Sequence, residues 1–320
     1  MVEGTRISVI FHRTATAMAA ACILAMTVQS ATAQNNGQKP WSVSGSLGVQ
    51  YNDNVTTDET DTTSNQSDKS LQLELGGLYK PKVGEKYGLE LGYDFSQSIF
   101  EDLTDFNLQS HALSMGIERE YSGIDTSLTY LYVHTFLGGD NFLGLHSLTP
   151  SVGYSVNDFW YASGRYSYQN KDFKSAANNN RDSDVNSFTL DNFLFFMEGK
   201  GFVSLGYRIE GEDTQDIELD YLGHYFHARI KSPIPVNSLE RWKPTVTAGY
   251  EYFKKDYSDI TASIGAKRED ERTTLKLGLS ADITEHVKAR LDYERIEAIS
   301  NLSSSDFDEN SVMVSLGFQY

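Results

Sequence analysis

Residues 41–51 read Trp-Ser-Val-Ser-Gly-Ser-Leu-Gly-Val-Gln-Tyr, and residues 312–320 read Val-Met-Val-Ser-Leu-Gly-Phe-Gln-Tyr. In both stretches, apolar side chains alternate with small or polar ones. Because successive side chains of a β-strand point to opposite faces of the sheet, each stretch has one apolar and one polar face. The two stretches therefore predict β-strands that contact an apolar environment on one side only.

The same two-residue period recurs between these stretches, and no comparable segment has a helical period. It predicts fourteen strands, at residues 41–51, 70–80, 87–96, 108–121, 125–136, 145–156, 159–169, 185–197, 202–210, 221–232, 245–254, 271–283, 287–297 and 311–320. Most have about ten to thirteen residues. At ~3.3 Å per residue and a tilt of ~40°, that length crosses an apolar band of ~25 Å.

The connections between the predicted strands alternate in length. The long ones are residues 52–69, 97–107, 137–144, 170–184, 211–220, 255–270 and 298–310. The others are short, except 233–244. Acidic residues are concentrated in the long connections. The pattern predicts an all-β fold, a closed antiparallel transmembrane β-barrel of about 14 strands with short periplasmic turns and long extracellular loops.

A soluble β-sandwich would also alternate apolar and polar residues. Two features favour the barrel. Strand lengths are uniform, and aromatic residues lie near strand ends, as in the interfacial girdles of membrane barrels. These aromatic residues are Tyr51, Tyr79, Tyr87, Tyr121, Phe136, Phe188, Tyr293 and Tyr320. Closure would also pair every backbone donor and acceptor between strands, which an open sheet in lipid cannot do.

Composition excludes several classes of protein. The 320 residues carry a formal charge of −17, with 19 Tyr and 17 Phe. A chain this aromatic is not an acidic disordered protein. The excess of acidic residues argues against nucleic-acid binding, which needs Lys and Arg for phosphate contacts. The mean hydropathy of −0.41 argues against a bundle of transmembrane helices.

The N-terminus predicts secretion. Arg6 and Arg13 precede an apolar run over residues 15–28, and Ala31-Thr32-Ala33 is a typical cleavage pattern. We therefore expect residues 1–33 to be a signal peptide, 34–40 a short periplasmic segment and 41–320 the barrel. The single cysteine, Cys22, lies in the apolar run, so the mature chain would have no disulfide.

Short stretches carry a family resemblance. The strand Val312–Tyr320, with aromatic Phe318 and Tyr320, resembles the assembly signal of Gram-negative outer-membrane barrels. Residues 48–55 resemble the first hairpin of a broad family of β-barrel porins, and they are similar to the barrel domain of surface lipoprotein assembly modifiers. Lys255-Asp256-Tyr257 is similar to a later element of these barrels.

The resemblance implies a location in the bacterial outer membrane. It also implies outer-membrane lipid, lipopolysaccharide and the barrel-assembly machinery as partners.

Polar strand faces should line the lumen. The charged pore-lining candidates are Glu74, Glu90 and Asp94 on the second and third strands, and Arg165, Arg208, Arg229 and Lys231 on the seventh, ninth and tenth. In a ring of fourteen, the second and third strands lie seven positions from the ninth and tenth, so these two pairs of strands face each other. Opposed acidic and basic arcs would select charged or dipolar solutes. Alternatively, these side chains form local ion pairs, for example with Asp191, and fill the lumen.

The first long connection is acidic, with Asp53, Asp58, Glu59 and Asp61. Calcium sites need several oxygen ligands, but EF-hand spacing is absent. We therefore expect no specific metal site, only diffuse binding of divalent cations at these four residues, and no cofactor.

Catalysis is not expected. His146 and Ser147 are adjacent, and His111 and Ser114 have odd spacing, so the members of each pair face opposite sides of a regular strand. Two functions remain open. One is a pore for passive diffusion of ions or small hydrophilic solutes. The other is a non-channel barrel that assists export or surface display of a polysaccharide or surface protein.

Overall fold

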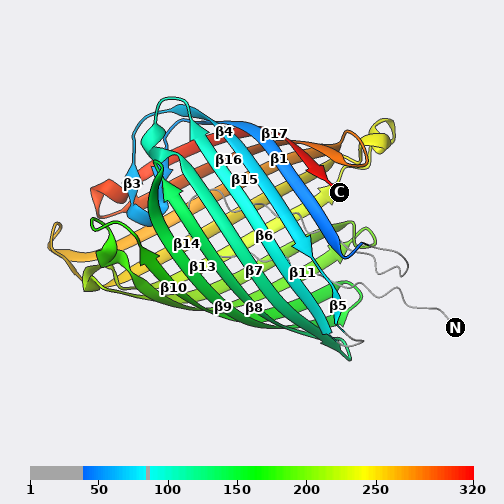
Figure 1. The fold of residues 1–320 in the computed structure, drawn as a ribbon, viewed down its shortest axis with the longest axis horizontal. Coiled ribbons are helices and arrows are strands. Elements are labelled where there is room, and N and C mark those ends of the chain that lie inside the picture. Colours follow the sequence, from blue (N-terminus) through cyan, green and yellow to red (C-terminus); the bar gives the residue numbers. More distant parts are fainter. Residues whose placement is uncertain (1–38, 84–86) are drawn as a thin grey trace.

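A computed structural model describes residues 39–83 and 87–320. The predicted signal peptide, residues 1–33, and most of the predicted periplasmic segment lie outside these residues. Fourteen long strands form the wall of a barrel (Figure 1). They are β1 (Trp41–Asn52), β4 (Asp68–Tyr79), β6 (Tyr87–Phe100), β7 (Leu108–Tyr121), β8 (Ile124–Leu137), β9 (Asp140–Asn157), β10 (Trp160–Phe173), β11 (Ser183–Phe196), β12 (Gly201–Thr214), β13 (Tyr221–Pro233), β14 (Thr245–Thr261), β15 (Ala266–Asp282), β16 (Val287–Ser300) and β17 (Phe307–Gln319).

Short elements lie in the connections. They are the strands β2 (Thr56–Thr57), β3 (Thr62–Thr63) and β5 (Lys82–Val83), and the 3-10 helices η1 (Asp58–Thr60), η2 (Thr104–Phe106), η3 (Asn179–Arg181), η4 (Ile217–Leu219), η5 (Asn237–Trp242) and η6 (Ser303–Ser305). Among the described residues, no helix has the length and hydrophobicity needed to cross a bilayer.

The sheet closes between its first and last strands. β1 pairs antiparallel with β4 on one side and with β17 on the other. The Val43 and Tyr320 backbones exchange two hydrogen bonds of 3.0 and 2.9 Å, which extend this pairing to the last residue. The Trp41 and Tyr320 rings lie 5.7 Å apart. Every wall strand therefore has two partners, and the predicted closed antiparallel 14-strand barrel is confirmed.

The alternation of side chains separates the two faces of the wall. Large apolar side chains point outward, and they include Val314, which is 59% exposed. Inward positions on the same strands carry mostly Ser, Thr, Gln and charged side chains, and many of these are buried. Phe318 and Tyr320, the residues of the predicted assembly signal, belong to the outward face. Lipid is the environment that this apolar outer surface fits.

At the extracellular end, the strands are longer than predicted. The connection predicted at 137–144 is a turn at 138–139, and the one predicted at 255–270 shrinks to 262–265. In water neither face of a hairpin has to be apolar, so backbone pairing continues after the apolar alternation has ended. The hairpins thus project beyond the apolar band, and only the first connection, residues 53–67, keeps a length close to the prediction.

A ring of outward-facing tyrosines marks the upper limit of the apolar band. In five of the seven extracellular hairpins, a tyrosine on the strand that runs towards the extracellular end bonds a polar side chain on the returning strand, two positions closer to the hairpin's tip. The pairs are Tyr93–His111, Tyr130–His146, Tyr166–Asn186, Tyr207–His224 and Tyr293–Asn310. Tyrosine suits a membrane interface because its ring is apolar and its hydroxyl is polar.

The outer face gives a direct test. Leu279 lies outward on β15 opposite Leu291, two residues further than Leu277 from the level of Tyr293 and the tyrosine ring. We expect Leu279→Arg to lower the free energy of unfolding by about 2–4 kcal/mol, because the guanidinium would lie in hydrocarbon. The measurement is urea unfolding of the protein in lipid vesicles. The control is Ser280→Arg, on the inward face of the same strand. Equal effects of the two variants would contradict the assignment of faces.

Candidate functional site

The first extracellular connection folds into the barrel instead of extending away from it. We call residues 53–67 L1. Its start is fixed to β17: both Asp53 carboxylate oxygens accept bonds from Asn310, at 2.6 and 2.7 Å, and Thr56 Oγ1 donates to Glu309 Oε2 at 2.7 Å. Val55 is only 2% exposed. The first residues of L1 therefore lie inside the barrel, next to the pairing of β1 with β17.

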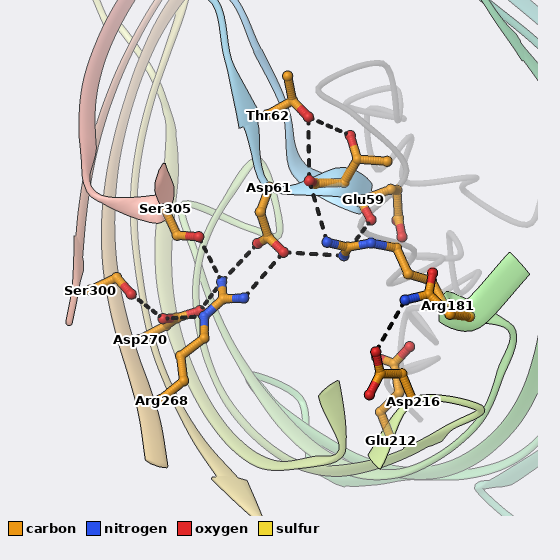
Figure 2. Close-up of polar contacts among 12 residues, drawn as sticks. Glu59, Asp61, Thr62, Arg181, Glu212, Asp216, Arg268, Asp270, Ser300 and Ser305 are labelled. Carbon is orange, nitrogen blue, oxygen red and sulfur yellow. Dashed lines mark hydrogen bonds and ion pairs between the residues drawn. The ribbon is translucent and has the colours of Figure 1, made fainter. Parts of the chain in front are cut away.

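The tip of L1 is held by two arginines, Arg181 of η3 in the connection between β10 and β11, and Arg268 of the wall strand β15 (Figure 2). Asp61 accepts from Arg181 Nη1 at 3.1 Å and from Arg268 Nη2 at 2.9 Å. Arg181 also donates to the carbonyl oxygen of Glu59 at 3.1 Å. Asp61 has a φ of 51°, a left-handed conformation that aspartate tolerates better than most residues. These contacts fix the turn that brings the carboxylate between the two guanidinium groups.

Arg268 is the most deeply buried member of this cluster, with 2% of its surface exposed. Its Nε and Nη2 donate to the two carboxylate oxygens of Asp270 at 2.9 and 2.7 Å, and Nη2 also bonds Ser305 Oγ at 2.9 Å. Figure 2 shows Asp61 and Asp270 on either side of this one guanidinium. A buried arginine is tolerated when it is paired and hydrogen-bonded in this way.

A second contact joins L1 to another part of the wall. The carboxylate of Glu59 lies 3.5 Å from Lys171 Nζ on β10, which also donates to Glu212 Oε1 at 3.1 Å. β10 and β15 are the seventh and twelfth strands of the ring, whereas L1 leaves between the first and the second. L1 therefore crosses the extracellular end of the lumen and bonds two distant parts of the wall.

The surroundings of Asp61 decide its ionisation. Burial alone would raise the pKa of this carboxyl group. The hydrogen bond and charge of Arg268, with the charges of Arg181 and Lys255, outweigh burial and lower the pKa from its ordinary 3.8 to about 2. The carboxylate is therefore ionised at every physiological pH.

All seven pore-lining candidates face the lumen, because the residues before and after each of them along its strand belong to the outer face. Some form local ion pairs. Glu90 contacts Lys80 at 2.8 Å, and Arg165 contacts Asp191 at 3.1 Å. Arg208, only 6% exposed, lies over the Tyr225 ring at 3.7 Å and near Glu210 at 3.5 Å.

The remaining candidates are Glu74, Asp94, Arg229 and Lys231. Of these, Lys231 is close enough to Lys288, Arg229, Arg290 and Asp282 for electrostatic interaction. The local pairing that the sequence left open is thus found for part of the set.

The inward charges are divided between two sides of the barrel. On β4, β6, β7 and β8, all inward-facing charges are acidic: Asp68, Glu74, Glu90, Asp94, Glu118, Glu120 and Asp125. The inward-facing Lys and Arg of the wall strands belong to β10, β12, β13, β14, β15 and β16. An acidic arc therefore faces a wall in which basic and acidic side chains alternate.

The acidic residues of L1 have partners in the protein. Asp53 bonds Asn310, Glu59 contacts Lys171, and Asp61 bonds two arginines. The side chain of Asp58 lies outside the described residues. Within residues 39–83 and 87–320, no group of three or more His, Cys, Asp or Glu side chains is arranged to hold a metal ion. Diffuse cation binding at these residues stays a prediction.

Comparison with known proteins identifies the family. Residues 118–319, more than half of the chain, match the model of the outer membrane protein beta-barrel domain. The chain belongs to this family. Members of it are placed in the bacterial outer membrane, which agrees with the apolar outer face. No curated protein matches the sequence.

Solved structures support the fold. The anion-selective porin from Comamonas acidovorans is 10% identical, with a TM-score of 0.53, and the match covers 88% of this chain and 99% of that one. The in-vitro folded OmpT, an outer membrane protein of Vibrio cholerae, is also 10% identical, with a TM-score of 0.50, covering 89% and 99%. At this identity, the likeness is one of fold. The similarity to surface lipoprotein assembly modifiers is not among these matches.

The contacts of Asp61 predict how firmly L1 is held. We expect Asp61→Asn to increase the rate at which proteinase K cleaves L1 by about tenfold, because the amide cannot hold two guanidinium groups as a carboxylate does. Mass spectrometry of the fragments locates the cut. Asp259→Asn, the same change at an exposed extracellular position, is the control. Equal cleavage of both variants would show that L1 does not depend on Asp61.

The low pKa of Asp61 also predicts a dependence on pH. Since the folded-state pKa is depressed, the carboxylate stabilises the fold fully above about pH 4 and loses this contribution, about 2 kcal/mol, as the pH falls towards 2. The measurement is the difference in unfolding free energy between the protein and Asp61→Asn. We expect a constant difference from pH 7 to 5 and a decline below pH 4. A difference that stays constant down to pH 2 would contradict the assigned ion pairs.

Proposed function

We propose that this outer-membrane barrel is a porin-like pore for passive diffusion of ions and small hydrophilic solutes. The observation that carries the proposal is the division of charge on a polar inner wall. Below L1, inward charges have accessible surface: Lys276 and Glu251, which form an ion pair at 3.0 Å, have side chains 45% and 52% exposed. A hydrated lumen with charged walls is what diffusion of polar solutes requires.

The two arcs give this pore a means of selection. Glu74 and Asp94 belong to the acidic arc, and Arg229 and Lys231 belong to the opposite wall. A field between them would orient dipolar solutes and separate the paths of cations and anions. The Comamonas porin is named as anion-selective, and Arg229 and Lys231 supply the chemistry that such selectivity would need here.

We also propose that the protein is not an enzyme. His146 lies on the outer face and bonds Tyr130, whereas Ser147 lies inward and bonds Ser167. His111 likewise bonds Tyr93 on the outer face. A nucleophile and its base must be within hydrogen-bond reach of each other, and these residues are directed apart.

The second candidate is a non-channel barrel that assists export or surface display of a polysaccharide or surface protein, as the likeness to lipoprotein assembly modifiers would imply. Contacts among the extracellular hairpins favour it. Asn180 bonds Asp216 at 3.1 Å, and the backbone N–H of Ala262 donates to Glu218 at 2.9 Å. Together with L1, these contacts build a joined outer surface that could serve as a docking platform.

For either function we propose lipopolysaccharide and outer-membrane lipid as neighbours of the tyrosine ring, and the barrel-assembly machinery as the partner during insertion.

Planar-bilayer recording tests the pore. We expect discrete conductance from the protein and a larger conductance from Asp61→Asn, because L1 is then less firmly held across the lumen. Arg229→Glu combined with Lys231→Glu should shift the reversal potential in a salt gradient towards cation selectivity. The control is Lys254→Glu, on the outer face. A protein that is silent even as Asp61→Asn would favour the non-channel function.

A further inference from the structure

Two side chains on the lumen side of the wall meet across an intervening strand. Asp191 of β11 and His227 of β13 both pair in register with Gly206 of β12, which lies between them. Because neighbouring strands are ~4.8 Å apart, the backbones of the two residues are separated by about 10 Å. Their side chains nevertheless come together, with His227 Nε2 3.1 Å from Asp191 Oδ1.

Gly206 makes this contact possible. A Cβ atom at position 206 would overlap both the Asp191 carboxylate and the His227 ring. Glycine in the interior of a strand has no side chain to pack, and it often marks a place where other groups approach closely. Here the missing side chain leaves an opening on the lumen side of β12, and the carboxylate and the imidazole ring occupy it.

Asp191 has a second partner on its other side. Arg165 of β10 lies diagonally across from it, and Arg165 Nη2 contacts Asp191 Oδ2 at 3.1 Å. Each carboxylate oxygen therefore faces a different side chain. As a result, only 4% of the Asp191 side chain is exposed, although the residue belongs to the inner face of a polar lumen.

The charge of Asp191 matters because the adjoining wall is basic. Arg208 of β12 is close enough to Arg165 for electrostatic repulsion, and Arg208 has Glu210 as its own acidic neighbour at 3.5 Å. Within residues 39–83 and 87–320, Asp191 is the carboxylate that forms an ion pair with Arg165. Without it, the charge of Arg165 would be uncompensated beside that of Arg208.

We propose that Asp191, held through the opening at Gly206, is a selectivity-determining residue of the pore. Its carboxylate compensates Arg165, and its own oxygens are covered by Arg165 and His227. One charge of each sign is thereby withdrawn from solutes that pass this part of the wall. The inference rests on the proposed pore function and deepens it, because it names residues that set the preference for anions or cations.

Two substitutions with opposite expected effects test the proposal. The measurement is the reversal potential in planar bilayers across a gradient of potassium chloride at pH 7. Asp191→Asn leaves Arg165 uncompensated beside Arg208, so we expect the ratio of chloride to potassium permeability to rise. The control is Asp184→Asn, the same change on the outer face of the same strand, which should leave the ratio unchanged.

Gly206→Ala changes no charge. Its methyl group should displace His227 from Asp191, so that an uncovered carboxylate oxygen faces the lumen, and we expect the ratio of chloride to potassium permeability to fall. The matched control is Gly211→Ala, because Gly211 lies on the outer face of the same strand and its Cβ atom would meet nothing within 4 Å. A merely structural disturbance of the wall would not move the ratio in opposite directions in the two variants.

The outcomes separate this inference from the pore itself. If the protein conducts, absence of the expected shift in either Asp191→Asn or Gly206→Ala would overturn the inference and leave the pore intact. A protein that conducts neither as the unchanged chain nor as Asp61→Asn would overturn both.

Discussion

Backbone hydrogen bonding in hydrocarbon is the constraint on which this structure depends. An unpaired N–H or C=O group has no water to bond within the apolar band, so a sheet that crosses it must have no free edge. The pairing of β1 with β17 meets this requirement, from Asn52 opposite Ser311 to Ser44 opposite Gln319. Closure then dictates the alternation, because one face of every strand meets lipid and the other meets the lumen.

L1 continues from the pairing of β1 with β17 into the lumen. It follows β1 directly and remains bonded to β17 through Asp53 and Thr56 before it turns inward. Its tip is then fixed by charge, with Asp61 between Arg181 and Arg268 and Glu59 beside Lys171. Much of the attraction in a buried ion pair offsets the cost of removing its two charges from water, but loss of one partner leaves the other charge buried and uncompensated, so the pairs hold one arrangement of the loop. Here that arrangement places a polar loop across the lumen.

The period of two was sufficient to predict the strands and the closed barrel, because lipid imposes the alternation over the whole apolar band. It failed at the extracellular ends, where hairpins continue in water without an apolar face, as in β14 and β15 up to Thr261 and Ala266. The inward course of L1 was not predicted either. Its ion pairs join Asp61 to residues 120 and 207 positions away, and no local pattern encodes such contacts.

The sequence also encodes the position of the outer limit of the apolar band. The strands that run towards the extracellular end carry a tyrosine at a similar distance from their first residue. Examples are Tyr93, Tyr130, Tyr166 and Tyr207, each six residues after the first residue of its strand. That spacing would have located the outer limit of the apolar band. The charged lumen positions, in contrast, were predictable from alternation, whereas their local partners depend on the register between neighbouring strands.

Cross-linking between β1 and β17 tests closure of the barrel most directly. Val49 of β1 and Val314 of β17 are register partners on the outer face, and the described chain contains no cysteine that would compete. With Val49→Cys and Val314→Cys in one chain, we predict rapid disulfide formation in native membranes, because paired positions bring the two sulfur atoms within bonding range. Val49→Cys combined with Phe318→Cys, four residues out of register, should not cross-link. Failure of the first pair, or equal reaction of both, would contradict the closed barrel.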